Sequence, residues 1–215
     1  MADPSAACLV LITDPRTSVD AYARILAESS TAVLPGSIAL QVRDKTSAPS
    51  VRSDRARRLA ELARRHDFPV LLNAPTTHEL LLAHEIAADG IHVPCTVQSV
   101  QSARDRGPVP AVVSVPCHSV EDVATAQGSG AHWVLVSPIF DVPGKGPPRG
   151  VQAIQESRTL APSVRVFALG GVDVCNVHLC AAAGASGVAV MRAMSESPTP
   201  GRVAHALCAP FGRAT

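Results

Sequence analysis

Aromatic residues are scarce in this chain of 215 residues, where phenylalanine, tryptophan and tyrosine together make up 3%. Few side chains are therefore present on which nucleic-acid bases could stack. The formal net charge is only +1, so electrostatics gives no reason to expect nucleic acid or an anionic membrane as a partner. No apolar run approaches the roughly 18 residues that a membrane-spanning helix needs. We therefore expect neither nucleic-acid nor membrane partners.

Targeting and disulfide signals are also missing. The N-terminal MADPSAACLVLITD has no basic region of the kind that opens a signal peptide, which predicts a cytoplasmic protein. The six cysteines contain no CxxC pair and no zinc-type spacing with histidine. We expect most of them to be small core residues in a reducing compartment, and we expect no metal site among them.

Apolar residues make up 47% of the chain and charged residues 17%, which suits one domain with a sizeable core over residues 1–215. The apolar residues gather in short β-branched runs separated by amphipathic stretches. Near-continuous apolar runs indicate strands that are covered on both faces, as in a parallel sheet. Eight such units predict an α/β fold, a single (β/α)8 barrel; an open doubly wound sheet is the alternative, but no GxGxxG follows the first run. The runs are Cys8–Thr13, Ile38–Val42, Pro69–Leu72, Gly90–Val93, Ala111–Val115, His132–Val136, Val164–Leu169 and Gly187–Met191.

A helix with many arginines is predicted over Arg52–Arg65. Its apolar residues, among them Ala56, Leu59 and Ala63, recur at helical spacing and indicate one buried face. We interpret the arginines as the solvated outer face of a barrel helix rather than as a nucleic-acid patch.

The last two predicted strands carry a candidate phosphate site. The run Val164–Leu169 ends at Gly170 and Gly171, and the next run ends at Met191 and Arg192. Glycines let backbone amides approach an anion, and (β/α)8 barrels often bind phosphate at the loops after their last two strands. The alternative is an ordinary glycine turn after a buried strand.

The loop that follows the sixth predicted strand, Asp141–Gly150, is too rich in proline and glycine for regular structure and carries Lys145 and Arg149. A long basic loop at a strand exit suits a lid over an anionic substrate. A plain surface loop with two solvated charges is the alternative.

Eight short motifs in a fixed order resemble the thiamine-phosphate synthase/TenI superfamily along nearly the whole chain. The fold that this resemblance implies is again a (β/α)8 barrel, and its members handle thiazole phosphate and, in the synthases, a pyrimidine diphosphate. The motifs are LITD (11–14), QVRDK (41–45), LLN (71–73), ADGIHV (88–93), SV with HS (114–119), SPIF with GKGPPRG (137–150), ALGGV (168–172) and GASGVAVM (184–191).

The resemblance implies roles for individual residues. Gln41, Arg43 and Lys45 alternate at a strand end, so they face the same way, and they match the site that holds the pyrimidine and its diphosphate. The remaining matches are Asn73 and Ser114 in the pyrimidine pocket, Lys145 at the departing diphosphate, and Gly170, Gly171 and the amides after Met191 at the thiazole phosphate. Arg192 stands where the family usually has a small residue, and its charge either strengthens phosphate binding or fills the site.

The chain departs from the patterns of this superfamily in three places. Two concern the magnesium ligands of the synthases, and the third concerns the catalytic histidine of the tautomerases. Synthases hold Mg²⁺ with an aspartate directly after the asparagine, where this chain has Ala74, and with another after the fourth strand, where His92–Val97 contains no acid. The catalytic histidine of TenI-type tautomerases lies at the end of strand six, where this chain has Ser137 and Pro138.

Cys117 and His118 offer a substitute proton carrier. They follow the fifth predicted strand in SVPCHS, and Cys95 on the preceding unit could face them. A Cys/His pair can relay a proton or form a covalent adduct. Helix capping by Ser119 explains the same turn without catalysis. His92 lies within a strand and is interpreted as a packing residue.

These observations leave three functions open. The favoured one is a TenI-like protein that binds thiazole phosphate, with a metal-independent tautomerase activity and no cofactor. The first alternative is an atypical thiamine-phosphate synthase, the one case in which Mg²⁺ is expected. The second is a non-catalytic or repurposed barrel for a phosphate ligand. In each case the expected partner is a small phosphorylated heterocycle, and a homo-oligomer is left open.

Overall fold

Eight parallel strands form a closed barrel in the computed structural model, which describes residues 3–105 and 112–215. β1 pairs with both β2 and β8, so the sheet closes and the open doubly wound alternative is wrong. The predicted strands are confirmed; Ala111, the predicted start of the fifth, lies outside the described residues. The strands are β1 (Leu9–Ile12), β2 (Ile38–Val42), β3 (Val70–Asn73), β4 (Gly90–His92), β5 (Val112–Cys117), β6 (Trp133–Val136), β7 (Arg165–Leu169) and β8 (Gly187–Val190).

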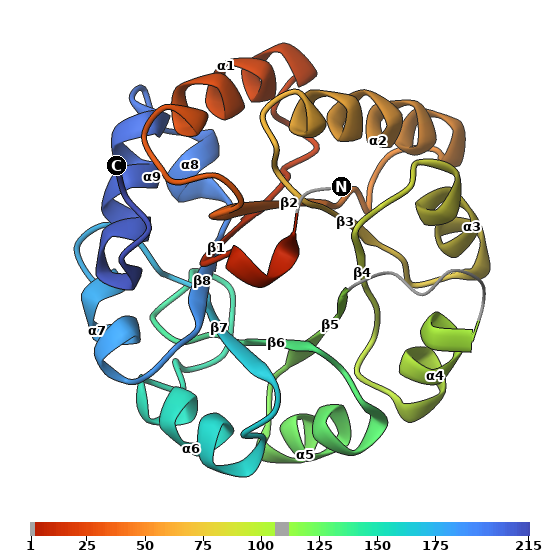
Figure 1. The fold of residues 1–215 in the computed structure, drawn as a ribbon. Helices are drawn as coiled ribbons and strands as arrows, with labels where there is room; N and C mark the ends of the chain where they lie inside the picture. The colour runs from red at the N-terminus through yellow and green to blue at the C-terminus, as the bar shows by residue number, and fades with distance from the viewer. Residues whose placement is uncertain (1–2, 106–111) are drawn as a thin grey trace.

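Helices surround the barrel as an outer ring (Figure 1). In the described part of the chain they are α1 (Val19–Ser30), α2 (Pro49–Arg64), α3 (Thr77–Glu85), α4 (Val97–Asp105), α5 (Val120–Ser129), α6 (Gln152–Leu160), α7 (Val177–Ala182), α8 (Arg192–Ser195) and α9 (Pro200–Cys208), with single 3-10 turns η1 (Pro4–Ala6) and η2 (Ala209–Phe211). None of these helices has the length and apolar character that crossing a bilayer would require.

Alternating strand residues divide the apolar side chains into two clusters. The inner cluster fills the barrel and consists mostly of strand residues, such as Val10, Leu71 and Phe167. The outer cluster lies between strands and helices and joins residues such as Leu40 to Leu59 of α2. Because both faces of every strand are covered, the strands read as continuous apolar runs in the sequence.

The amino end of the barrel is closed by η1, visible in Figure 1 as the red turn inside the ring of strands. Arg165, the first residue of β7, donates hydrogen bonds to the carbonyl oxygens of Pro4 at 3.3 Å, Ser5 at 2.8 Å and Ala7. Its guanidinium carbon lies 5.4 Å from the ring centre of Trp133, at cation–π distance. Burial lowers the pKa of Arg165, whereas Cys8 and the Asp3 carboxylate nearby oppose this shift, and the carbonyl oxygens hold the guanidinium by hydrogen bonds.

The arginine-rich segment forms α2, with Ala56, Leu59, Ala60 and Ala63 on its buried face as predicted. Its arginines are not all free in solvent. Arg57 bonds to Glu85, and other arginines of α2 bond to α3 and to the β1–α1 loop. The helix is thus fastened to its neighbours by the residues that the sequence pattern assigned to solvent.

Candidate active site at the carboxyl end of the barrel

Polar side chains replace apolar ones toward the carboxyl ends of β2 to β5. We call this end of the barrel the barrel mouth. Asn73, His92 and Ser114 occupy adjacent register positions on β3, β4 and β5, so their side chains face the same side of the sheet. His92 Nδ1 lies 3.0 Å from Ser114 Oγ. Gln41 lies on the interior face of β2, is 1% exposed, and its Oε1 has no hydrogen-bond partner. The mouth therefore holds a buried polar acceptor that a ligand donor could satisfy.

His92 was interpreted from the sequence as a packing residue, but the structure places it among these polar groups. Its hydrogen bond to Ser114 satisfies one ring nitrogen. Burial, with the charges of Arg43 and Lys45 adding to it, lowers the pKa of His92 to about 3. The imidazole is therefore neutral at physiological pH. The sequence offered one signal for this position, because His92 lies near the end of its predicted strand and Asn73 directly follows the predicted strand before it.

Three cations gather at the mouth, and we call Arg43, Lys45 and Lys145 the cation cluster. The charge of Arg43 is the main cause that lowers the pKa of Lys45, followed by burial and by the charge of Lys145. Lys145 thus comes from the distant β6–α6 loop to the vicinity of Lys45. Like charges brought this close repel one another unless an anion lies among them. The cation cluster is accordingly a candidate site for a polyanionic group.

Arg149, the other basic residue of the same loop, lies elsewhere. Its charge acts on Cys117 and Glu121, near the start of α5. The two ends of the loop are tied together, because Arg149 N–H bonds to Pro138 O at 2.8 Å and Gly150 N–H bonds to Ile139 O at 3.1 Å. Closure of this loop as a lid stays a prediction.

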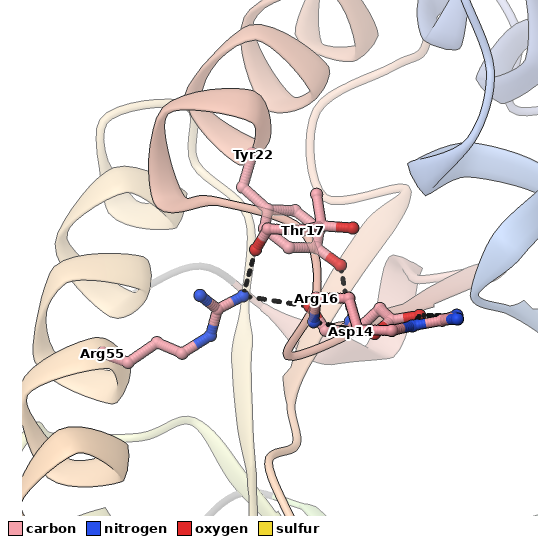
Figure 2. A network of polar contacts seen from close by, with 5 residues as sticks. All are labelled: Asp14, Arg16, Thr17, Tyr22 and Arg55. Atoms are coloured by element: carbon pink, nitrogen blue, oxygen red, sulfur yellow. Dashed lines mark hydrogen bonds and ion pairs between the residues drawn. The ribbon is translucent and has the colours of Figure 1, made fainter. Parts of the chain in front are cut away.

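The β1–α1 loop is held by a polar network that the sequence did not reveal (Figure 2). Asp14 N–H donates to Tyr22 Oη at 2.6 Å, and Arg55 Nη2 donates to the carbonyl oxygens of Asp14 at 3.0 Å and Thr17 at 2.6 Å. The Asp14 carboxylate binds Arg16, which is the main cause that lowers the pKa of Asp14. The loop between β1 and α1 is therefore fixed from both α1 and α2.

Gly170 and Gly171 have a structural reason to be glycine. Both have positive φ, of 94° and 66°. A Cβ on Gly170 would lie 2.8 Å from Pro138 Cα, and one on Gly171 would lie 2.6 Å from Asp141 O. The β6–α6 loop therefore crosses directly over the end of β7. This contact accounts for both glycines, and their role in phosphate binding stays a prediction.

Met191 joins β8 to the short α8, and Arg192 is the first residue of α8. Met191 packs against the inner cluster, and its carbonyl oxygen accepts from Met194 N–H and Ser195 N–H. The Arg192 side chain is exposed, so it does not fill the interior of the barrel. Its part in binding phosphate also stays a prediction.

Cys117 does not reach the barrel mouth. It is fully buried in the outer cluster between the barrel and the helices, because its place in β5 puts it one residue out of phase with Ser114. Hydrogen bonding to Cys95 and burial raise the pKa of the Cys117 thiol, so it stays protonated and unreactive. The expected approach of Cys95 is confirmed, but the pair lies behind the strands, and a catalytic Cys117 does not agree with this position.

His118 is exposed at the β5–α5 turn. Its Nδ1 lies 3.2 Å from Ser137 Oγ and 3.1 Å from Ser137 O. Its backbone N–H donates to the Asp122 carboxylate at 2.7 Å, next to the capping box that Ser119 forms with Asp122. The capping explanation of this turn is confirmed. A catalytic role of His118 stays a prediction without Cys117 as its partner.

The residues at the mouth do not fit magnesium. Ala74 stands at the position of one expected carboxylate and is buried in the outer cluster. Asp44 Oδ1 accepts hydrogen bonds from Ser47 and Thr46, and although burial opposes ionisation these bonds lower the pKa of Asp44 to about 2. Its Oδ2 is buried without a hydrogen-bond partner, but one free carboxylate oxygen does not make the set of oxygen ligands that Mg²⁺ takes. Residues 3–105 and 112–215 contain no group of three His, Cys, Asp or Glu that could hold a metal ion.

A (β/α)8 barrel with polar and cationic residues at the carboxyl ends of its strands has the usual layout of an enzyme of this fold. Residues 9–194 match the family described as thiamine monophosphate synthase, and the chain belongs to this family. It is 32% identical over 207 residues to the thiamine-phosphate synthase of Methylococcus capsulatus, covering 94% of this chain and 88% of that protein. It is 30% identical over 215 residues to the thiamine-phosphate synthase of Chlorobium phaeovibrioides, covering 96% and 95%.

Solved structures show the same barrel. Thiamine phosphate pyrophosphorylase from Pyrococcus furiosus superposes with a TM-score of 0.80 at 19% identity, covering 97% of both chains. The protein titled KGPDC from Streptococcus mutans superposes with a TM-score of 0.73 at 14% identity, covering 96% of this chain and 98% of that one. At these identities the likeness shows the fold alone, and barrels with different names share it.

Proposed function

We propose that the protein is a transferase of the thiamine-phosphate synthase type, which moves a pyrimidine group from its diphosphate to thiazole phosphate. The observation that carries this proposal is the cation cluster beside Gln41. A diphosphate carries several negative charges, and a guanidinium with two ammonium groups can bind its oxygens from different sides. The synthase names of the relatives support the same reaction.

In this proposal the polar residues of the mouth bind the pyrimidine. Gln41 and Asn73 offer amide groups that can both donate to and accept from a heterocycle, and Ser114 offers a hydroxyl already bonded to His92. Since His92 is neutral, it adds no positive charge beside the ring. Arg43, Lys45 and Lys145 stabilise the charge that grows on the diphosphate as it leaves.

The tautomerase is no longer the favoured function. The family and its relatives carry synthase names, which denote a transferase, and they do not single out the TenI-like branch. The end of β6 has Ser137 where a tautomerase would have its histidine, and Ser137 Oγ is engaged with His118.

The thiazole phosphate is proposed to bind where the loops after β7 and β8 meet, at Gly170, Gly171, Met191 and Arg192. The exposed Arg192 supplies a positive charge that favours a phosphate there. The proposed partner is thus a pair of small phosphorylated heterocycles. The cytoplasmic location, the homo-oligomer and the absence of a nucleic-acid partner stay predictions.

The test is an assay with both substrates. The protein is mixed with the pyrimidine diphosphate and thiazole phosphate, with either Mg²⁺ or EDTA, and thiamine phosphate and released diphosphate are measured. Formation of both products, and its loss in Arg43→Met, supports the proposal. Binding of both ligands without turnover under either condition would overturn it in favour of a non-catalytic barrel.

A further inference from the structure

Thr13 makes two hydrogen bonds to the backbone of Arg43. Its Oγ1 accepts from Arg43 N–H at 2.9 Å and donates to Arg43 C=O at 3.1 Å. Thr13 is fully buried and follows β1, and Arg43 follows β2. The last backbone hydrogen bond between the two segments runs from Thr13 N–H to Gln41 O at 3.0 Å. The threonine side chain therefore extends the pairing of β1 and β2 by one residue, up to Arg43.

The backbone next to Thr13 is itself fixed. Asp14 N–H bonds to the buried Tyr22 of α1, and Arg55 of α2 holds the carbonyl oxygens of Asp14 and Thr17, as Figure 2 shows. The hydroxyl of Thr13 is thus presented from a segment that two helices hold in place. Hydrogen bonds from a fixed segment transfer that rigidity to the group they bind.

We propose that Thr13 is a positioning residue that holds Arg43 in place for a diphosphate ligand. This inference rests on the proposed function, in which Arg43 binds the diphosphate. A side chain whose backbone is already ordered loses less conformational entropy when it binds a ligand, and the ligand therefore binds more tightly. The same ordering favours diphosphate binding by Lys45, which lies two residues further along the same loop. The affinity for thiazole phosphate is not affected, because the loops proposed to bind it follow β7 and β8.

A purely structural role for Thr13 has a different consequence. A buried threonine that only packs would change the stability of the fold and would weaken both ligands alike, or neither. A positioning role weakens the diphosphate ligand selectively. Two substitutions separate these roles: Thr13→Val keeps the shape but removes both hydrogen bonds, and Thr13→Ser keeps both.

The experiment is calorimetric titration of the whole protein with inorganic pyrophosphate and, separately, with thiazole phosphate. We expect Thr13→Val to bind pyrophosphate about tenfold more weakly and thiazole phosphate within about twofold of the wild type, with Thr13→Ser close to the wild type for both. Ser157→Ala is the matched control, because Ser157 is buried and its hydroxyl bonds to a helix carbonyl at 2.6 Å in α6. It should leave both affinities unchanged.

Three results would overturn the inference. Wild-type affinity of folded Thr13→Val for pyrophosphate is one, and equal weakening of both ligands is another. If Thr13→Val does not fold, Tyr22→Phe takes its place; it removes the acceptor of Asp14 N–H, and unchanged pyrophosphate affinity in that variant is the third. Failure of the wild type to bind pyrophosphate is distinct from these, because it would refute the proposed function itself.

Discussion

His92 Nδ1 and Ser114 Oγ lie 3.0 Å apart on adjacent strands, so the imidazole at the barrel mouth is held by a neutral hydroxyl instead of a carboxylate. With no negative partner there, burial and the charges of Arg43 and Lys45 keep it unprotonated. This relationship links the chemistry of the mouth to the stability of the fold.

The free energy of unfolding should fall as the pH is lowered through the range in which only unfolded His92 takes up a proton. The folded pKa is about 3 and the unfolded pKa is 6.5, so the unfolded state binds more protons between these values and stability rises with pH. From pH 7 to pH 5 we expect the wild type to lose about 2 kcal/mol more than His92→Gln. Urea unfolding at both pH values measures this, and parallel losses in the two proteins would refute it.

Lys145 should contribute to anion affinity, whereas Arg149 in the same loop should not. Lys145→Met removes one charge of the cation cluster, and we expect pyrophosphate to bind about tenfold more weakly. Arg149→Gln is the matched control, since the Arg149 charge acts on Glu121 and Cys117. Titrations at low and moderate salt measure both variants; equal weakening would mean that only the net charge of the loop matters.

Gly171→Ala should cost more stability than Gly212→Ala. Both glycines have positive φ, but a Cβ on Gly171 would lie 2.6 Å from Asp141 O, whereas Gly212 has nothing within 4 Å. We expect a loss of about 3 kcal/mol at Gly171 against about 1 kcal/mol at Gly212, where only the backbone conformation resists. Denaturant unfolding gives both values. Equal losses would show that the crossing of the β6–α6 loop is not tight.

Arg165→Met should destabilise the barrel by about 3 kcal/mol, because it removes the side-chain donors to the carbonyl oxygens of Ser5 and Ala7 at the closed end, while Pro4 O keeps the backbone N–H of Ala7 as a donor. Arg202→Met, at an exposed position of α9, should stay within about 0.5 kcal/mol of the wild type. Thermal and urea unfolding test both variants. A loss at Arg165 as small as at Arg202 would mean that η1 is not held by the guanidinium.

The order of elements was predictable from the sequence because short apolar runs in alternation with amphipathic helices suit few architectures other than a closed parallel barrel. The side of the sheet that a side chain faces was harder to predict at the ends of the strands. Cys117 and Ser114 both looked close to a site, yet three residues along a strand is an odd number, so they face opposite sides of the sheet. His92 was interpreted as a packing residue, because a histidine within an apolar run suggests packing until its neighbours across the sheet are known.

The sequence by itself determined the barrel, the family resemblance and the residue types of the mouth, because these depend on local periodicity and on motifs within one β/α unit. Only the tertiary structure decided which of them meet. It brings Lys145 to Lys45, sends Arg149 to Glu121, places the Thr13 hydroxyl on the backbone of Arg43 and buries Cys117 behind the sheet. Those pairings join residues that are far apart in the chain, and the closure of the barrel, which fixes the register of all eight strands together, sets their distances.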